Sequence, residues 1–112
     1  MSELRKLTVE FLKVLADPVR IEILYLLEKN KLSSSELQEE LGRSQSTISK
    51  HLNMLAENNL IAFEKRDNVN YYKIKNNEVI DLINDITTIV LNINRKKLKD
   101  LQDADIRDVL SP

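Results

Sequence analysis

Apolar side chains recur at spacings of three and four residues in the first part of the chain. The members of this stripe are Leu4, Leu7, Phe11, Leu12 and Leu15. Such spacing is typical of one face of a helix, so the pattern predicts an amphipathic helix over residues 3–15. A second helix is expected after Asp17, whose carboxylate can cap it, with Pro18 at its first position, where a missing N–H is harmless. We expect this helix to end near Lys29 or Asn30.

The next segment predicts two short helices separated by the only glycine of the chain. Ser33 and Glu36 have the spacing of a capping box, and Gly42 suits the end of that helix because glycine readily adopts a positive φ. Ser44 can then cap the following helix. That helix has Ile48, Leu52 and Leu55 on one face and Ser46, Ser49, Lys50 and Asn53 on the other. Together the two helices predict a helix-turn-helix over residues 34–58.

From residue 60 onward the apolar period changes to two, which predicts strands. The alternating apolar residues are Ile61, Phe63, Tyr72 and Ile74. The run between them, from Arg66 to Asn70, is polar, and its Asp67 and Asn68 tolerate left-handed turn geometry. We therefore expect a hairpin, the wing of a winged helix-turn-helix, over residues 60–75.

A last helix is expected over residues 77–99, capped by Asn76 or Asn77. Its apolar residues have the heptad spacing of an interhelical seam, and the helix extends beyond what so small a core can cover. We therefore predict a dimer formed through the first and last helices. The predicted dimer interface consists of Leu4, Leu7, Phe11, Val79, Ile83, Ile86, Val90 and Ile93. The alternative is that this helix packs only on its own domain. The charged remainder from Arg95 is expected to fray.

These elements define a mainly α fold with a small β-hairpin, in the order of four helices, two strands and a final helix. The chain has 112 residues, a size that favours one winged-helix domain spanning residues 1–112. No stretch approaches the roughly 20 apolar residues of a membrane span. We therefore expect a cytoplasmic protein with no membrane partner.

Composition narrows the chemistry further. The chain contains one histidine and no cysteine. It therefore has no disulfide, no thiolate metal site and no cysteine nucleophile, and one histidine cannot supply a multi-histidine cage. No set of convergent titratable groups can be assembled. We expect no enzymatic activity, no cofactor and no metal site.

Charge is informative only locally, because the whole chain has a net charge of −1. Residues 43–75 hold 6 basic and 3 acidic groups, a positive balance that suits a polyanion. In a helix-turn-helix the second helix presents its N-terminal polar residues to base edges in the major groove, and a wing reaches the flanking backbone or minor groove. The candidate residues for binding double-stranded DNA are Ser44, Gln45, Ser46, Thr47, Ser49, Lys50, Lys65, Arg66, Asn68 and Asn70.

Several short motifs resemble a known family. The chain reads LADPVRIEIL at residues 15–24, SEL at 35–37 and LGRSQSTISKHL at 41–52, followed by the pair Tyr71 and Tyr72. Over roughly residues 10–75 it is similar to the arsenical-resistance-repressor (ArsR/SmtB) family of winged-helix transcriptional regulators. The resemblance implies a homodimer whose two recognition helices read a palindromic operator. It also implies repression of transcription, with release of DNA when an effector binds.

The chain departs from this family at its metal ligands. Metal-sensing relatives carry ELCVCDL before the recognition motif, whereas this chain reads KLSSSEL at residues 31–37, with Ser33 and Ser35 at both thiolate positions. Hydroxyls do not hold soft metals. Other relatives place aspartate, histidine and glutamate on the last helix, where this chain has Asp81 and Asp85 but no histidine. We therefore expect no thiolate metal sensing, and the effector stays open among an apolar small molecule, a partner protein and none.

Two residues keep open interpretations at this stage. His51, at the edge of the apolar face of the recognition helix, suits either packing or a phosphate contact. Arg20 suits either a DNA phosphate or a neighbouring acid.

The rival function is a winged-helix protein-interaction module without specific DNA binding. That function predicts an apolar or acidic exposed face, so the polar face around Ser46 and Lys50 favours DNA binding.

Overall fold

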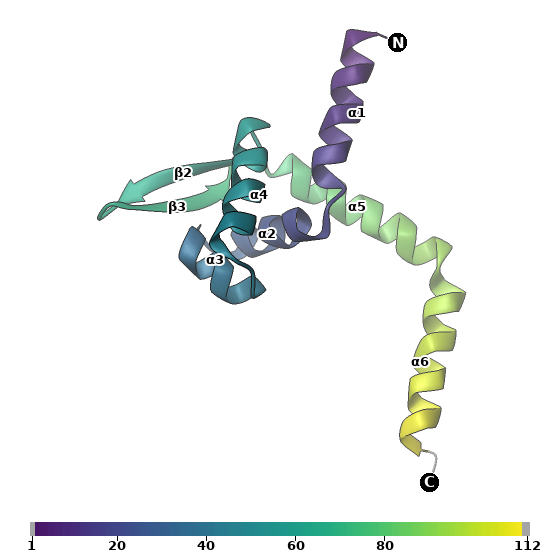
Figure 1. Ribbon diagram of the computed structural model, residues 1–112. Helices are drawn as coiled ribbons and strands as arrows, with labels where there is room; N and C mark the ends of the chain where they lie inside the picture. Colours follow the sequence, from purple (N-terminus) through teal and green to yellow (C-terminus); the bar gives the residue numbers. More distant parts are fainter. Residues whose placement is uncertain (1, 111–112) are drawn as a thin grey trace. The chain divides into compact units, whose positions relative to one another are not determined.

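The computed structural model describes residues 2–110, with side chains for residues 2–104, and it is mainly helical with one small sheet (Figure 1). The elements are α1 (Glu3–Leu15), α2 (Pro18–Lys29), β1 (Leu32–Ser33), α3 (Ser34–Leu41), α4 (Gln45–Glu57), β2 (Ile61–Arg66), β3 (Val69–Ile74), α5 (Glu78–Ile93) and α6 (Arg95–Leu110). They form two compact units that divide after Ile80, within α5. A single domain over residues 1–112 therefore stays a prediction.

The helix-turn-helix begins and ends as its capping residues predict. Ser33 Oγ accepts the Glu36 N–H over 3.2 Å while Glu36 Oε1 accepts the Ser33 N–H over 3.0 Å, which completes the capping box of α3. Gly42 follows α3 with a φ of 61°. Ser44 Oγ accepts the Thr47 N–H over 3.3 Å and caps α4. The helices begin at Ser34 and Gln45, directly after the predicted caps, and α4 ends at Glu57 with Asn58 as its C-cap.

The start of α2 is also confirmed. Asp17 Oδ1 accepts the backbone N–H groups of Val19 and Arg20 over 2.9 and 3.1 Å, and Pro18 occupies the first turn. The helix ends at Lys29, as expected.

The core of the first unit lies among α2, α3 and α4. Its largest fully buried side chains are Ile23, Leu24, Leu37, Ile48, Leu52 and Leu55. Leu60 and Ile61, at the start of the hairpin, are buried as well. The apolar face predicted for the second helix of the helix-turn-helix is therefore the face that anchors α4, and its opposite face is free to carry a site.

The sheet has three antiparallel strands in the order β1–β3–β2, one strand more than the sequence predicts. The β2–β3 hairpin pairs Arg66 with Val69 across Asp67 and Asn68, whose φ values of 52° and 64° are those of a two-residue turn. β1 pairs Leu32 with Tyr72 and Ser33 with Tyr71. A strand of two residues is too short to show a period of two, so sequence patterning did not indicate it.

The expected helix over residues 77–99 is corrected by the structure. Asn76 Oδ1 accepts the Glu78 N–H over 2.9 Å, so the predicted cap is confirmed, but α5 ends at Ile93 and α6 begins at Arg95. At the junction both the backbone N–H and the side-chain amide of Asn94 donate to the Val90 carbonyl oxygen, over 3.0 and 2.8 Å. A side chain that enters the helical hydrogen-bond ladder is a known cause of a break.

The segment from Arg95 is helical rather than frayed, which also corrects the prediction. Its lysine, leucine, arginine and glutamine residues are strong helix formers, and this local propensity outweighs the high charge. Across the part of the chain that the structure describes, no helix combines the length and the apolar character needed to cross a membrane.

Candidate nucleic-acid interface

The first turns of α4 present a polar surface. Ser44, Gln45, Ser46 and Lys50 are exposed, and Thr47 and Ser49 are half-buried. Because Ile48 and Leu52 anchor the opposite face of α4 in the core, this surface is held in one orientation. It combines hydroxyl and amide groups, which both donate and accept hydrogen bonds, with one cation.

Three hydroxyls at the start of α4 form a local network. Ser44 Oγ donates to Thr47 Oγ1 over 3.0 Å and lies 3.2 Å from Ser46 Oγ. It also accepts the Thr47 N–H, so Ser44 is engaged in holding the helix start. Within residues 2–104, Gln45 and Lys50 make no side-chain hydrogen bond, so their polar groups are free to reach a ligand.

The DNA-binding residues predicted on the wing differ in how exposed they are. Lys65, Arg66 and Asn68 are exposed. The Arg66 guanidinium lies 5.5 Å from the centre of the Tyr71 ring, a cation–π contact that orients it. Asn70 is half-buried, and its Oδ1 is buried without a hydrogen-bond partner among the described residues. The wing therefore offers two exposed cations near its tip.

A carboxylate that sequence reasoning did not single out gathers three cations at the base of the wing. Glu64 Oε1 accepts a hydrogen bond from the Lys31 ammonium over 2.7 Å. The same oxygen lies 3.6 Å from Arg66 Nη2, and Glu64 Oε2 lies 3.7 Å from Lys73 Nζ. The hydrogen bond and charge of Lys31 lower the pKa of Glu64 most, with Lys73 and Arg66 adding to the effect. The wing is therefore less positive than its count of cations indicates.

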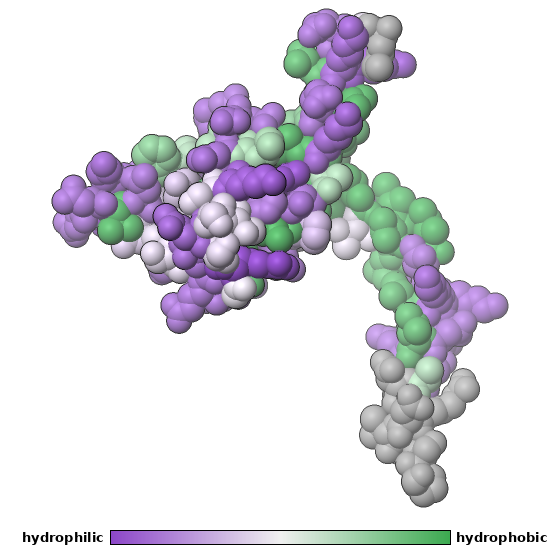
Figure 2. Space-filling view, in the orientation of Figure 1, coloured by the Kyte–Doolittle hydropathy of each residue, from purple (hydrophilic) through white to green (hydrophobic). Residues whose placement is uncertain are grey.

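The residues predicted for a dimer interface divide into two groups. Leu4, Leu7, Ile86, Val90 and Ile93 are exposed, Phe11 is half-buried, and Val79 and Ile83 are buried in the single chain. Further large apolar side chains are exposed on these helices and on α6, among them Leu12, Leu82, Ile89, Leu91, Leu98 and Leu101. Figure 2 shows the apolar surface along α5, in contrast to the mostly polar wing tip. Part of the predicted seam is thus core, and the rest is uncovered apolar surface.

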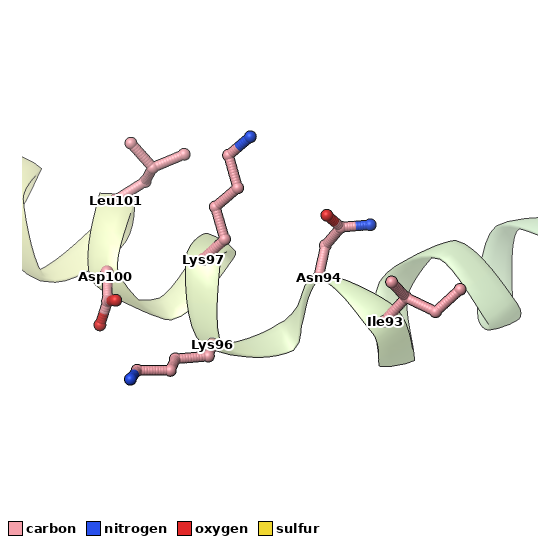
Figure 3. Close-up of a pocket in the computed structure, with 6 residues that line it drawn as sticks. All are labelled: Ile93, Asn94, Lys96, Lys97, Asp100 and Leu101. Atoms are coloured by element: carbon pink, nitrogen blue, oxygen red, sulfur yellow. The ribbon is translucent and has the colours of Figure 1, made fainter.

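The described residues bring no metal-binding group together, and the hollow beside α5 and α6 does not direct its polar groups to one point (Figure 3). Across residues 2–104, no three His, Cys, Asp or Glu side chains come together to hold a metal ion. A hollow of about 460 Å³ lies at the junction of α5 and α6. Figure 3 shows Lys97 and Leu101 on one side of its helix and Lys96 and Asp100 on the other. These groups do not point toward a common ligand.

Comparisons with known proteins identify the family to which a chain with this helix-turn-helix and wing belongs. The model of the bacterial regulatory protein, arsR family, matches residues 17–62. The arsenical resistance operon repressor of Staphylococcus xylosus is 40% identical over 79 residues, which cover 70% of this chain and 75% of that protein.

Solved structures show the same fold. The crystal structure of Rv0081 from Mycobacterium tuberculosis aligns with a TM-score of 0.80 and 28% identity, covering 88% of this chain and 99% of that one. A homodimeric winged helix-turn-helix DNA-binding domain from Mycobacterium bovis aligns with a TM-score of 0.73 and 21% identity, covering 85% of this chain and 93% of that one. The chain is therefore a winged helix-turn-helix protein that belongs to the ArsR family of bacterial regulatory proteins.

Proposed function

We propose that this protein is a sequence-specific double-stranded DNA-binding regulator that represses transcription as a homodimer on a palindromic operator. The observation that carries the proposal is the polar face at the start of α4, fixed by the buried Ile48 and Leu52 and accompanied by a cationic wing. Repression follows the name of the Staphylococcus xylosus relative. A DNA-binding role places the protein in the cytoplasm.

The side chains of α4 suit base readout in the major groove. Gln45 can bond to adenine at two positions, and Ser46 can bond to several bases. Thr47 adds a methyl group that suits thymine, and Lys50 can reach guanine or a phosphate. Ser44 holds the start of the helix through its contacts with Ser46 and Thr47. Lys65 and Arg66 of the wing would contact flanking phosphates or the minor groove, with Asn68 beside them.

A titration tests this function directly. Fluorescence anisotropy should show tighter binding to DNA from upstream of the protein's own gene than to a shuffled control, with an affinity that falls steeply as salt rises. We expect Lys50→Ala to lower the salt slope by about 1 if Lys50 neutralises a phosphate. Ser46→Ala should change base preference by about 1–3 kcal/mol. Glu57→Gln, at the far end of α4, serves as the control.

Weak and equal binding of both DNAs at every salt concentration would contradict the proposal. That result would favour a winged-helix module that binds another protein. An equal loss on every DNA sequence from Ser46→Ala would contradict direct base readout by that hydroxyl.

The proposed homodimer uses the exposed apolar faces of α1 and α5. Two copies would present their recognition helices to half-sites about 34 Å apart, one turn of DNA. Ile86 is 42% exposed, so Ile86→Asp should disturb the dimer more than the fold of the single chain. We expect this variant to sediment as a monomer and Asp85→Asn, also exposed on α5, to remain a dimer. An unchanged sedimentation mass of Ile86→Asp would refute this interface.

A further inference from the structure

The end of α1, the start of α2 and the recognition helix α4 belong to the first unit (Figure 1). A single arginine joins all three. Arg20 lies in the first turn of α2, and its Nε donates to the Val14 carbonyl oxygen over 2.6 Å. Its Nη2 donates to the Lys13 carbonyl oxygen over 3.4 Å. Its Nη1 lies 3.1 Å from Nδ1 of His51 on α4. The guanidinium therefore holds the last turn of α1 against α4.

The contact fixes the protonation state of His51. A guanidinium only donates hydrogen bonds, so Nδ1 of His51 accepts and the ring proton lies on Nε2. His51 is only 9% exposed, so water does not readily replace this partner. Protonation of the ring turns the acceptor into a donor and brings two cations within 3.1 Å of each other.

The charges that face His51 come from α2, α4 and the turn before α4. Asp17 Oδ1 lies 4.0 Å from His51 Nδ1, and Arg20, Lys50 and Arg43 add positive charge. Burial lowers the pKa of His51 most, Asp17 raises it, and the three cations lower it, which leaves it below the ordinary value of 6.5. The imidazole is therefore neutral at pH 7. The ring becomes protonated only below pH 6.5, as the pH falls through this lowered pKa.

We propose that the Arg20–His51 contact positions the recognition helix for DNA binding, and that protonation of His51 releases it. This inference rests on the proposed DNA-binding function. Because α1 carries part of the predicted dimer interface, one guanidinium would join the dimer-forming helix to the DNA-reading helix. Preference for the operator then falls in acid. A histidine that contacted a phosphate would behave in the opposite way, since its protonation would strengthen binding.

The first test needs no DNA. Because the chain has one histidine, a full-length sample labelled with ¹⁵N-histidine reports on His51 alone. We expect the Nε2–H tautomer above pH 7 and a titration midpoint below 6.5. Arg20→Ala should raise the midpoint, whereas Lys29→Ala, which removes an exposed cation at the other end of α2, should leave it unchanged. The Nδ1–H tautomer in the wild-type protein, or equal midpoints in Arg20→Ala and the wild type, would overturn the contact.

The second test measures the preference for upstream over shuffled DNA at about pH 7.5 and about pH 5.5. For the wild-type protein we expect this preference to be lower at the acidic pH. The fall should be on the order of tenfold for each unit by which the pKa of His51 is lower in the operator-bound protein than in the free protein. His51→Asn retains an acceptor near the position of Nδ1 but does not titrate. Its preference should therefore be retained at both pH values, provided that its circular dichroism matches the wild type.

The outcomes separate this inference from the function on which it rests. An equal pH dependence in His51→Asn and the wild type, or a wild-type preference that rises in acid, would overturn the switch. No preference for upstream DNA near pH 7.5 would instead refute the proposed function. The tautomer and the midpoint shift would still decide whether the contact exists.

Discussion

Replacement of Ser33 by alanine isolates one half of the capping box that starts the helix-turn-helix. Ser33 is 6% exposed, and its hydroxyl accepts the Glu36 N–H over 3.2 Å. The substitution removes this acceptor and keeps the other half, in which Glu36 Oε1 accepts the Ser33 N–H. It also keeps the backbone pairing of Ser33 with Tyr71 in the sheet, because that pairing does not involve the side chain.

The size of the effect follows from this geometry. Loss of a serine N-cap destabilises a protein by about 0.5–2 kcal/mol. The upper part of that range applies here, because the lost hydrogen bond is partly buried, so water only partly replaces the serine hydroxyl at the freed Glu36 N–H. We therefore expect Ser33→Ala to lower the free energy of unfolding by about 1–2 kcal/mol. At a slope of about 2 kcal/mol/M this lowers the urea midpoint by about 0.5–1 M.

Urea unfolding followed by circular dichroism measures this difference. Both proteins must be at equal concentration, because dimerisation would otherwise shift the midpoint. Ser35→Ala is the matched control, since Ser35 is exposed in the same turn and makes no side-chain hydrogen bond in the described structure. Its free energy of unfolding should stay within about 0.5 kcal/mol of the wild type. Equal midpoints for Ser33→Ala and Ser35→Ala would refute the stabilising role of the cap.

Three further predictions follow from the fold. Leu55→Ala, at a fully buried position of α4, should lower the free energy of unfolding by about 2–5 kcal/mol in the same urea assay. Burial raises the pKa of Asp17, but the backbone hydrogen bond from Arg20 and the charge of that residue outweigh it, so the pKa lies below 3.8. The stability that Asp17 adds is therefore present above pH 3.8 and lost as the pH falls through its lowered pKa. Asp17→Asn should remove this component from the pH dependence of the urea midpoint. Asn68→Val should destabilise the wing turn, because a β-branched residue resists a φ of 64°. Asn68→Gly should not, because glycine adopts this φ readily. Two-dimensional NMR of residues near the turn distinguishes a destabilised turn from an intact one in the two variants.

The fold was predictable wherever the signal was local. Asp17, Ser33, Gly42 and Ser44 each act within four residues of their own position, and all four occupy the helix ends that the sequence predicts. The break at Asn94 was not predictable in this way. It depends on which carbonyl the asparagine amide selects, and no glycine or proline marks it in the sequence.

The candidate site was predictable in its polar character but not in its internal contacts. The exposed face of α4 follows from helical periodicity, which needs only the sequence. The Arg20–His51 contact joins residues 31 positions apart, and the Lys31–Glu64 pair joins residues 33 apart. Pairings at such separations depend on how the helices and strands pack, so the sequence left Arg20 open between two roles and gave Glu64 none.

The short strand β1 has a mechanical consequence for the wing. Ser33 pairs with Tyr71 and is also the N-cap of α3, so the sheet and the helix-turn-helix meet at one residue. Tyr71 in turn lies beneath the Arg66 guanidinium near the wing tip. The wing is therefore attached to the N-terminus of α3 through β1, and the β2–β3 hairpin does not move independently of that helix. A displacement of the wing tip is therefore coupled to the first turn of α3 through Tyr71 and Ser33, in addition to the direct contact between β2 and the recognition helix α4.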